Sequence, residues 1–219
     1  MKLLAFDTST ELCSAALYLD GAWSVCEAMA GNRHSELLLP MIGALLSEAG
    51  LGLADLDGLA YGKGPGSFTG LRIGCGVAQG LALGVDIPVA GVATLEAMAY
   101  ATGADRIIAC IDARMHEIYA AAYRRQGEVM VEAMAPAVLK PAELTLPDAG
   151  DWLGCGTGFA AYPDLLAGQL AKVQANLYPH ARAIAQLALP VFASGQGAAA
   201  DTAEPFYVRD KVAFKTCER

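Results

Sequence analysis

The chain lacks a long uninterrupted apolar run, although hydrophobic residues make up 55% of its 219 residues. The longest stretch without a charged residue, 183–200, contains Pro190, Gly195 and Gly197, which makes it a poor candidate for a bilayer-spanning helix. At the N-terminus, Asp7 arrives too soon for the apolar region of a signal peptide. We therefore expect a cytoplasmic protein that does not enter a membrane.

The chain also has few residues suited to metal or nucleic-acid sites. None of its six cysteines forms a C-x-x-C pair, and its three histidines lie far apart. His116-Glu117 is followed by Ala120 where an H-E-x-x-H motif needs its second histidine. The formal net charge is −8, and the largest basic cluster is Arg124-Arg125, whereas phosphate binding needs a basic patch. We expect reduced thiols, no metal site, and RNA contact only through a partner.

The sequence does contain short apolar segments separated by turn residues. Apolar runs and alternation predict strands at residues 2–7, 13–19, 23–29, 58–62, 89–92, 108–112 and 118–123. Apolar residues at helical spacing predict helices at 35–49, 70–83, from 94 onward and at 181–192. Ser35 is expected to cap the first helix and Gly50 to end it. This mixture of helices and strands predicts an α/β protein.

Two hairpins about 105 residues apart resemble each other. Each has an apolar strand that ends in aspartate, Asp7 or Asp112, then a polar turn and a returning strand of small residues. The repeat favours duplication of one αβ unit, although the alternative that two unrelated hairpins look alike stays open. Duplication predicts two similar lobes across a cleft, residues 1–103 and 104–219, with a C-terminal tail that can return to the first lobe.

The most informative motif is the glycine-rich segment 62–74, GKGPGSFTGLRIG. It follows a predicted strand and opens a predicted helix, where backbone N–H groups and the helix N-terminus can hold an anion. It is not a Walker A loop, because no Lys-Ser or Lys-Thr pair follows at the required spacing. The same glycines suit a tight strand-to-helix turn equally well.

A second candidate for phosphate binding is the turn formed by Asp7, Thr8, Ser9 and Thr10. Hydroxyl and N–H groups in such a hairpin can hold phosphates, while the aspartate holds Mg²⁺ through water. Serine and threonine are also ordinary turn formers. The matching turn, residues 112–117, lacks the glycine that allows a phosphate to approach the backbone, so half of a two-loop clamp is missing.

The helix predicted at 70–83 is unusually rich in glycine. Each interior glycine costs roughly 1 kcal/mol relative to alanine, so close packing must compensate. The glycines lie on more than one face, which favours one face against the sheet and another against a partner, although both faces can also be internal. The helix at 35–49 has an apolar arc wider than one core-facing stripe needs. Together the two helices predict a docking surface.

Five motifs resemble the TsaB family in order and spacing and cover nearly the whole chain. They are LAFDTST at 4–10, RHSELLLP at 33–40, GPGSFTGLRIG at 64–74, DAR at 112–114 and PFYVR at 205–209. The resemblance implies an ASKHA fold (actin, sugar kinase and Hsp70-like) built from duplicated RNase H-like lobes. It also implies a pseudo-enzyme: TsaB is similar to the catalytic protein TsaD, whose metal site uses a His-x-x-x-His pair, and here His34 is followed by Leu38.

The resemblance further implies a role in threonylcarbamoyl transfer to adenosine 37 of ANN-decoding tRNAs, through binding and activating TsaD. The implied partners are TsaD, the P-loop ATPase TsaE and a second copy of the chain in a homodimer, with tRNA reached only through the complex. ATP or ADP with Mg²⁺ is a candidate ligand at the complex interface. The implied partner surface consists of His34, Leu37, Leu38, Met41, Leu45, Gly70, Leu71, Gly74, Val77, Ala78 and Leu81.

Two other functions fit the same residues. An ASKHA-type kinase or ATPase would use Asp7 and the hydroxyls of Thr8, Ser9 and Thr10, whereas a homodimeric scaffold would need no nucleotide. The historical protease label is disfavoured, because the sequence has neither a metal-binding histidine pair nor a G-x-S-x-G elbow.

Overall fold

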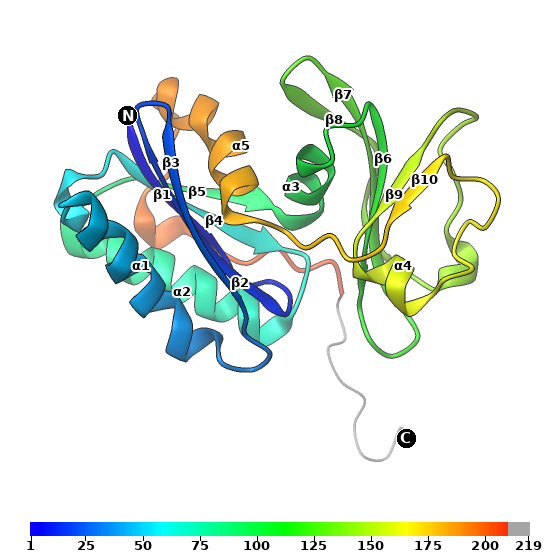
Figure 1. Ribbon diagram of the computed structural model, residues 1–219, viewed down its shortest axis with the longest axis horizontal. Coiled ribbons are helices and arrows are strands. Elements are labelled where there is room, and N and C mark those ends of the chain that lie inside the picture. The colour runs from blue at the N-terminus through cyan, green and yellow to red at the C-terminus, as the bar shows by residue number, and fades with distance from the viewer. Residues whose placement is uncertain (210–219) are drawn as a thin grey trace.

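Two five-stranded sheets lie side by side in the computed structural model, which describes residues 1–209 (Figure 1). The strand order is β3-β2-β1-β4-β5 in the first sheet and β8-β7-β6-β9-β10 in the second. In both sheets the first three strands in sequence form an antiparallel meander, and the last two run parallel to the first of them. The shared order bears out the duplication that the paired hairpins predicted.

The first sheet consists of β1 (Lys2–Asp7), β2 (Leu12–Leu19), β3 (Ala22–Met29), β4 (Gly58–Gly64) and β5 (Val89–Ala93). The second consists of β6 (Arg106–Asp112), β7 (Ile118–Gln126), β8 (Val129–Leu139), β9 (Leu153–Cys155) and β10 (Lys172–Gln174). The helices are α1 (His34–Ala49), α2 (Phe68–Val85), α3 (Thr94–Ala101), α4 (Thr157–Ala161) and α5 (Ala181–Ala193). Single 3₁₀ turns lie at Leu53–Asp55, Pro141–Glu143 and Ala200–Thr202.

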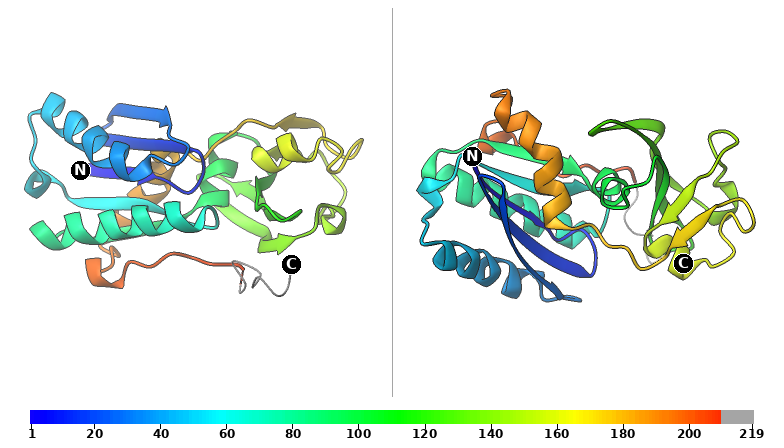
Figure 2. Two further views of the ribbon diagram at one scale, coloured as in Figure 1. Left: turned by 90° about the horizontal axis from the view of Figure 1, so that it is seen from below. Right: turned by 45° about the horizontal axis from the view of Figure 1, so that its top comes forward.

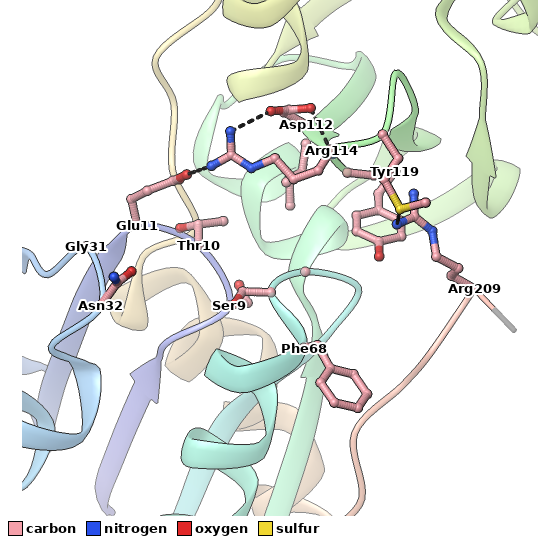
Figure 3. A pocket seen from close by; sticks show the side chains of 15 residues that line it. Ser9, Thr10, Glu11, Gly31, Asn32, Phe68, Asp112, Arg114, Tyr119 and Arg209 are labelled. Atoms are coloured by element: carbon pink, nitrogen blue, oxygen red, sulfur yellow. Dashed lines mark hydrogen bonds and ion pairs between the residues drawn. The ribbon is translucent and has the colours of Figure 1, made fainter. Parts of the chain in front are cut away.

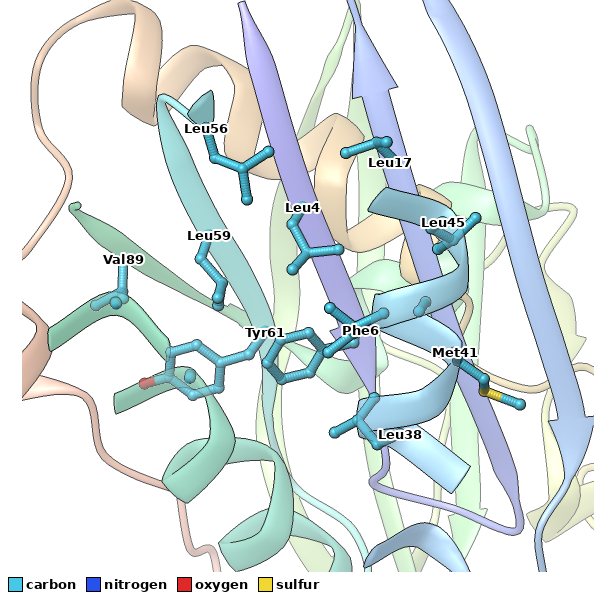
Figure 4. Close-up of a cluster of buried hydrophobic side chains, with 14 of the residues drawn as sticks. Leu4, Phe6, Leu17, Leu38, Met41, Leu45, Leu56, Leu59, Tyr61 and Val89 are labelled. Carbon is cyan, nitrogen blue, oxygen red and sulfur yellow. The ribbon is translucent and has the colours of Figure 1, made fainter. Parts of the chain in front are cut away.

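Helices cover both faces of the first sheet. On one face α1 and α2 run beside each other over β2 and β4 (Figure 2). Alternate strand residues such as Leu4, Phe6 and Leu59 point toward these helices and meet Leu38 and Leu45 of α1 (Figure 4). The intervening residues are small, including Ala5 and Ala60, and pack against α5 on the other face. Alternation along each strand thus builds two cores.

The second sheet is also covered on both faces, but by shorter helices. On one face α3 supplies Leu95 and Met98 to a cluster with Ile107 and Tyr123 of the strands. On the other face α4 and its neighbouring loops supply Phe159 and the fully buried Trp152, among others, to a second cluster. Since α3 also contacts β4, β5 and α5, it packs between the two sheets.

The C-terminal segment returns to the first lobe. After β10 the chain crosses back, and α5 packs on β1, β2, β4 and β5. Beyond the turn Ala200–Thr202, residues 203–209 run beside α2 toward the second sheet (Figure 2). We propose that the two lobes divide between residues 103 and 104, with α5 of the second half completing the core of the first lobe.

The sequence patterns located most elements but missed several boundaries. Ser35 does not cap α1: the helix begins at His34 after Arg33, with no side-chain cap, whereas Gly50 ends it in the left-handed conformation as expected. Helix α2 begins earlier than predicted because the side chain of Ser67 accepts a hydrogen bond from Gly70 N at 3.3 Å. Strands β8, β9 and β10 and helix α4 were not predicted.

Helix α2 is the one described helix that is long and apolar enough, by length and composition, to cross a membrane. Its buried residues pack along β4 in the first core. One third of the helix is buried in this way, and the remainder is partly or fully exposed.

Candidate functional site

The turn Asp7–Thr10, the candidate phosphate loop, is buried. Asp7, Thr8 and Ser9 are each only 1% exposed, and Thr10 is also buried. Several polar groups of the turn bind one another and their neighbours, although Thr10 Oγ1 has no partner among the described residues. Ser9 N and Ser9 Oγ donate to Asp7 Oδ1 at 2.8 and 2.7 Å. Thr8 Oγ1 donates to the carbonyl of Gly70 at 2.7 Å. The hydroxyls of Thr8 and Ser9 are thus already engaged within the chain.

The glycines of the motif at 62–74 are required by this turn. A Cβ on Gly70 would lie 1.9 Å from the carbonyl oxygen of Thr8, and one on Gly66 would lie 2.4 Å from that of Ser9. At Gly62 a Cβ would lie 1.8 Å from Asp7 Oδ2. Ser67 N donates to the carbonyl of Ser9 at 2.7 Å, which fixes the loop on the turn. Of the two interpretations of the motif, these contacts favour tight packing.

Asp7 is the one acidic group in this packed region with a markedly altered acidity. Burial raises its pKa to about 6, and the two hydrogen bonds from Ser9 offset only part of that rise. Asp7 Oδ2 has no hydrogen-bond partner among the residues that the structure describes. A buried carboxylate that is half satisfied destabilises the folded protein in its charged form.

The side chain of His34 likewise contacts other residues of the chain. Its Nε2 lies 2.6 Å from the carbonyl oxygen of Thr10, its side chain is buried, and burial lowers its pKa. Within residues 1–209 no three histidine, cysteine, aspartate or glutamate side chains come together as a metal site would require. His34 therefore ties α1 to the Asp7–Thr10 turn.

A cavity of about 360 Å³ lies between this turn and the second lobe (Figure 3). The first lobe lines it with residues that include Thr10, Asn32 and Ser67, and the second lobe with residues that include Asp112 and Arg114. Across it, Arg114 pairs with Glu11 at 2.9 Å, and within its own lobe it pairs with Asp112 at 3.0 Å. Arg114, Met115 and His116 all have left-handed backbone conformations, with φ of 60°, 55° and 60°.

The structure buries most of the residues expected to form the partner surface. Eight of its eleven residues are buried in the chain's own core, and only Leu37, Val77 and Leu81 are partly exposed. Their helical spacing marks the side of each helix that faces the sheet. A stripe of core residues and a stripe of interface residues repeat with the same period, so the spacing alone does not distinguish them. The buried residues are His34, Leu38, Met41, Leu45, Gly70, Leu71, Gly74 and Ala78.

The opposite face of the same two helices is exposed and made largely of small residues. On α2 these are Gly76, Gly80 and Gly84, spaced four apart, and a Cβ built on any of them would meet no atom within 4 Å. On α1 the exposed residues include Gly43 and Ala44. Such a face lets the backbone of another helix approach closely. The large exposed apolar side chains on these helices are Leu39, Phe68 and Leu83.

Comparison with known proteins identifies the family. The model of the family described as "TsaD: tRNA N6-adenosine threonylcarbamoyltransferase" matches residues 25–213. The tRNA threonylcarbamoyladenosine biosynthesis protein TsaB of Escherichia coli is 43% identical over 98% of this chain and 97% of its own length. The TsaB of Haemophilus influenzae is 38% identical over 98% and 96%. The chain belongs to the TsaB family.

Solved structures agree with this assignment. A Pseudomonas aeruginosa protein described as similar to the peptidase YEAZ is 42% identical and superimposes with a TM-score of 0.90, covering 95% of this chain and 99% of that one. A structure of YeaZ from the same organism is 42% identical with a TM-score of 0.89. The matches, together with the two like sheets, confirm the ASKHA-type α/β fold of duplicated RNase H-like lobes.

Sequence reasoning missed three residues around the cavity: Glu11, Arg114 and Arg209. Arg114 and Arg209 did stand in the motifs at 112–114 and 205–209, which contributed to the family resemblance, but nothing in the sequence placed them near each other. Their positions depend on the packing of the two lobes and on the return of the C-terminal segment.

Proposed function

We propose that this TsaB-family protein is the non-catalytic subunit that binds and activates a TsaD-like enzyme during threonylcarbamoyl transfer to tRNA. Membership of the TsaB family, whose relatives carry the name of tRNA threonylcarbamoyladenosine biosynthesis, supports the pathway. A subunit of this kind acts by binding the active conformation of its partner more tightly than the inactive one. In this proposal tRNA and TsaE meet the chain only within the complex.

The observation that carries the non-catalytic role is the state of the Asp7–Thr10 turn. A phosphate loop must offer free hydroxyl and N–H groups, whereas here Ser9 N and Ser9 Oγ donate to Asp7, and Thr8 Oγ1 donates to Gly70 O. The carbonyl oxygens of Thr8 and Ser9 lie where side chains on Gly70 and Gly66 would otherwise be. In this proposal the turn itself holds no nucleotide, and the interface of the complex is the candidate site for ATP or ADP with Mg²⁺.

The docking surface in this proposal is the exposed face of α1 and α2. It combines closely approachable backbone at Gly76, Gly80 and Gly84 with the exposed apolar side chains of Leu39 and Leu83. Interfaces of this kind bury an apolar centre with close shape complementarity. The same face can receive a second copy of the chain, so we propose that homodimer formation competes with binding to TsaD.

Reconstitution tests the proposal. A purified TsaD-like enzyme is given tRNA and threonylcarbamoyl-adenylate with and without this chain, and modified adenosine is scored by nucleoside chromatography. We expect modification to require the chain and to survive Asp7→Asn. Loss of modification in Asp7→Asn, with binding to TsaD intact, would instead favour a nucleotide-binding enzyme and overturn the non-catalytic role.

The docking face is tested by Gly80→Leu. The new side chain enters empty space in the isolated chain but obstructs a helix that approaches α2. We expect unfolding stability to be retained and binding to the TsaD-like partner to weaken at least tenfold, since an obstructed interface core costs 1.4 kcal/mol or more. Ala160→Leu, on an exposed position of α4 in the second lobe, is the control. Equal binding by the two variants would place the partner elsewhere.

A further inference from the structure

The last described residues of the chain, 203–209, form a strap along the first lobe. The carbonyl of Ala203 accepts hydrogen bonds from Gln79 Nε2 at 2.8 Å and from Cys75 Sγ at 3.3 Å. Farther along, Phe206 N donates to the carbonyl of Lys63 at 2.6 Å. These bonds fix the strap to α2 and to the end of β4.

The far end of the strap contacts the second lobe. The guanidinium of Arg209 pairs with the carboxylate of Glu117 and lies 3.6 Å from the sulfur of Met115. It also stands over the ring of Tyr119, 5.6 Å from the ring centre. The Arg209 side chain is only 11% exposed, so this ion pair is screened by solvent far less than a surface pair. The strap therefore bridges the two lobes.

A second bridge stands on the other side of the same cavity. Arg114 of the second lobe reaches Glu11 of the first at 2.9 Å, while its other terminal nitrogen binds Asp112 at 3.0 Å. Figure 3 shows Arg114 and Arg209 on opposite sides of the cavity between the lobes. Away from the cavity the lobes are joined by the chain itself, near residues 102–105 and 175–180, and by α3, which packs between the two sheets.

The two bridges hold the two ends of one strained turn. Between Arg114 and Glu117 the backbone keeps three consecutive left-handed residues, none of them glycine. Each such residue costs roughly 1–2 kcal/mol relative to a right-handed conformation. The turn is closed by hydrogen bonds between Ala113 N and Glu117 O and between Glu117 N and Arg114 O, both 3.0 Å. Its conformation therefore needs support from outside.

We propose that the strap and Arg114 form a latch that fixes the opening between the lobes and holds the Arg114–Glu117 turn in its left-handed form. Separation of the lobes breaks the Arg209–Glu117 and Arg114–Glu11 pairs together, because each pair joins one lobe to the other. Relaxation of the turn also removes Glu117 and Arg114 from their partners. Cleft opening and the conformation of the turn are thus one coupled equilibrium.

The test uses the full chain with donor and acceptor dyes at Glu48 on α1 and Lys172 on β10, both exposed, introduced as non-canonical amino acids. Single-molecule energy transfer reports the distance between the lobes, and hydrogen exchange reports the amides of residues 113–119. Arg209→Gln is expected to raise the open population and the exchange rate of the turn by about tenfold, the effect of losing one charge-assisted hydrogen bond. Arg114→Gln is expected to have a smaller effect, because Arg114 is more exposed.

Matched variants distinguish the effect of breaking the latch from the effects of lost charge or lost folding. Arg33→Gln removes an equal charge from an exposed arginine that makes no ion pair within residues 1–209, and it should change neither readout. The exchange Arg209→Glu with Glu117→Arg should restore both readouts at least in part. The double variant of Arg114→Gln and Arg209→Gln should multiply the two fold-changes. The proposal is overturned if Arg209→Gln behaves as Arg33→Gln, or if the turn exchanges faster while the distance between lobes stays the same.

Discussion

Two glycines of α2 should respond in opposite directions to the same substitution. At Gly80 an added methyl meets no atom within 4 Å, so Gly80→Ala should stabilise the protein by about 0.5–1 kcal/mol through helix propensity alone. At Gly70 the methyl would lie 1.9 Å from the carbonyl oxygen of Thr8 and 3.4 Å from Ser67 Cβ. Both neighbours belong to packed segments, and the Thr8 contact is with backbone that cannot rotate away.

Relief of that contact at Gly70 requires separation of α2 from the Asp7–Thr10 turn, with loss of the hydrogen bond from Thr8 Oγ1 to Gly70 O. Overpacking of this kind costs about 1–3 kcal/mol, and a broken buried hydrogen bond adds about 1 kcal/mol. After the propensity gain is subtracted, Gly70→Ala should destabilise the protein by about 2–3 kcal/mol. The two variants should therefore differ by roughly 3 kcal/mol, or about a hundredfold in the unfolding equilibrium constant.

Urea unfolding followed by far-UV circular dichroism measures this difference, and unchanged m-values ensure that the midpoints report stability. Equal stability of the Gly70→Ala and Gly80→Ala proteins would refute the claim that the motif glycines exist for contact with the turn. Their separate roles, internal packing at Gly70 and an open helix face at Gly80, would then have no energetic basis.

Further predictions concern the same region. Because the pKa of Asp7 is raised to about 6 from 3.8, its contribution to stability is greatest below pH 3.8 and is lost as pH rises to 6, by about 3 kcal/mol. Asp7→Asn should reduce this decrease in unfolding free energy, measured in a series of unfolding curves from pH 4 to 7. If the free energy of the variant falls with pH as steeply as that of the wild type, the decrease belongs to other groups. Ser67→Ala removes the cap of α2 and should cost about 1 kcal/mol in urea unfolding, whereas Ser35→Ala, at a position that caps nothing, should cost less than half as much.

The sequence predicted the fold where local pattern and tertiary packing agree. Strand β1 was predicted to the residue because Lys2–Asp7 is apolar and bounded by turn residues, and the matching β6 revealed the repeat. Strands β9 and β10 have three residues each, which is too short for a period to be visible. Strand β8 was missed because Pro136 and several alanines hide its alternation, and its pairing with β7 contains register shifts.

The sequence predicted which segments form the candidate site, but not whether their polar groups are free or hydrogen-bonded. The sequence placed Asp7–Thr10 and the glycines of 62–74 among the important residues, because both are unusual for ordinary strand ends. Whether the glycines admit a phosphate or another backbone depends on distances between segments some sixty residues apart, such as the bond from Thr8 to Gly70. The burial of α1 and α2 depends on tertiary packing in the same way: the helical period shows an apolar stripe on each helix, but only the position of the sheet shows which stripe is internal.

The return of α5 to the first sheet has a consequence for how the chain reaches its fold. During synthesis all five strands of the first sheet leave the ribosome well before α5, the helix that covers Ala5, Ala60 and Val92. Until α5 arrives, that face of the sheet exposes apolar surface of the kind that drives aggregation. The N-terminal half is thus an incomplete folding unit, and a fragment ending at residue 103 should need the remainder of the chain, supplied covalently or in trans, to become soluble and native.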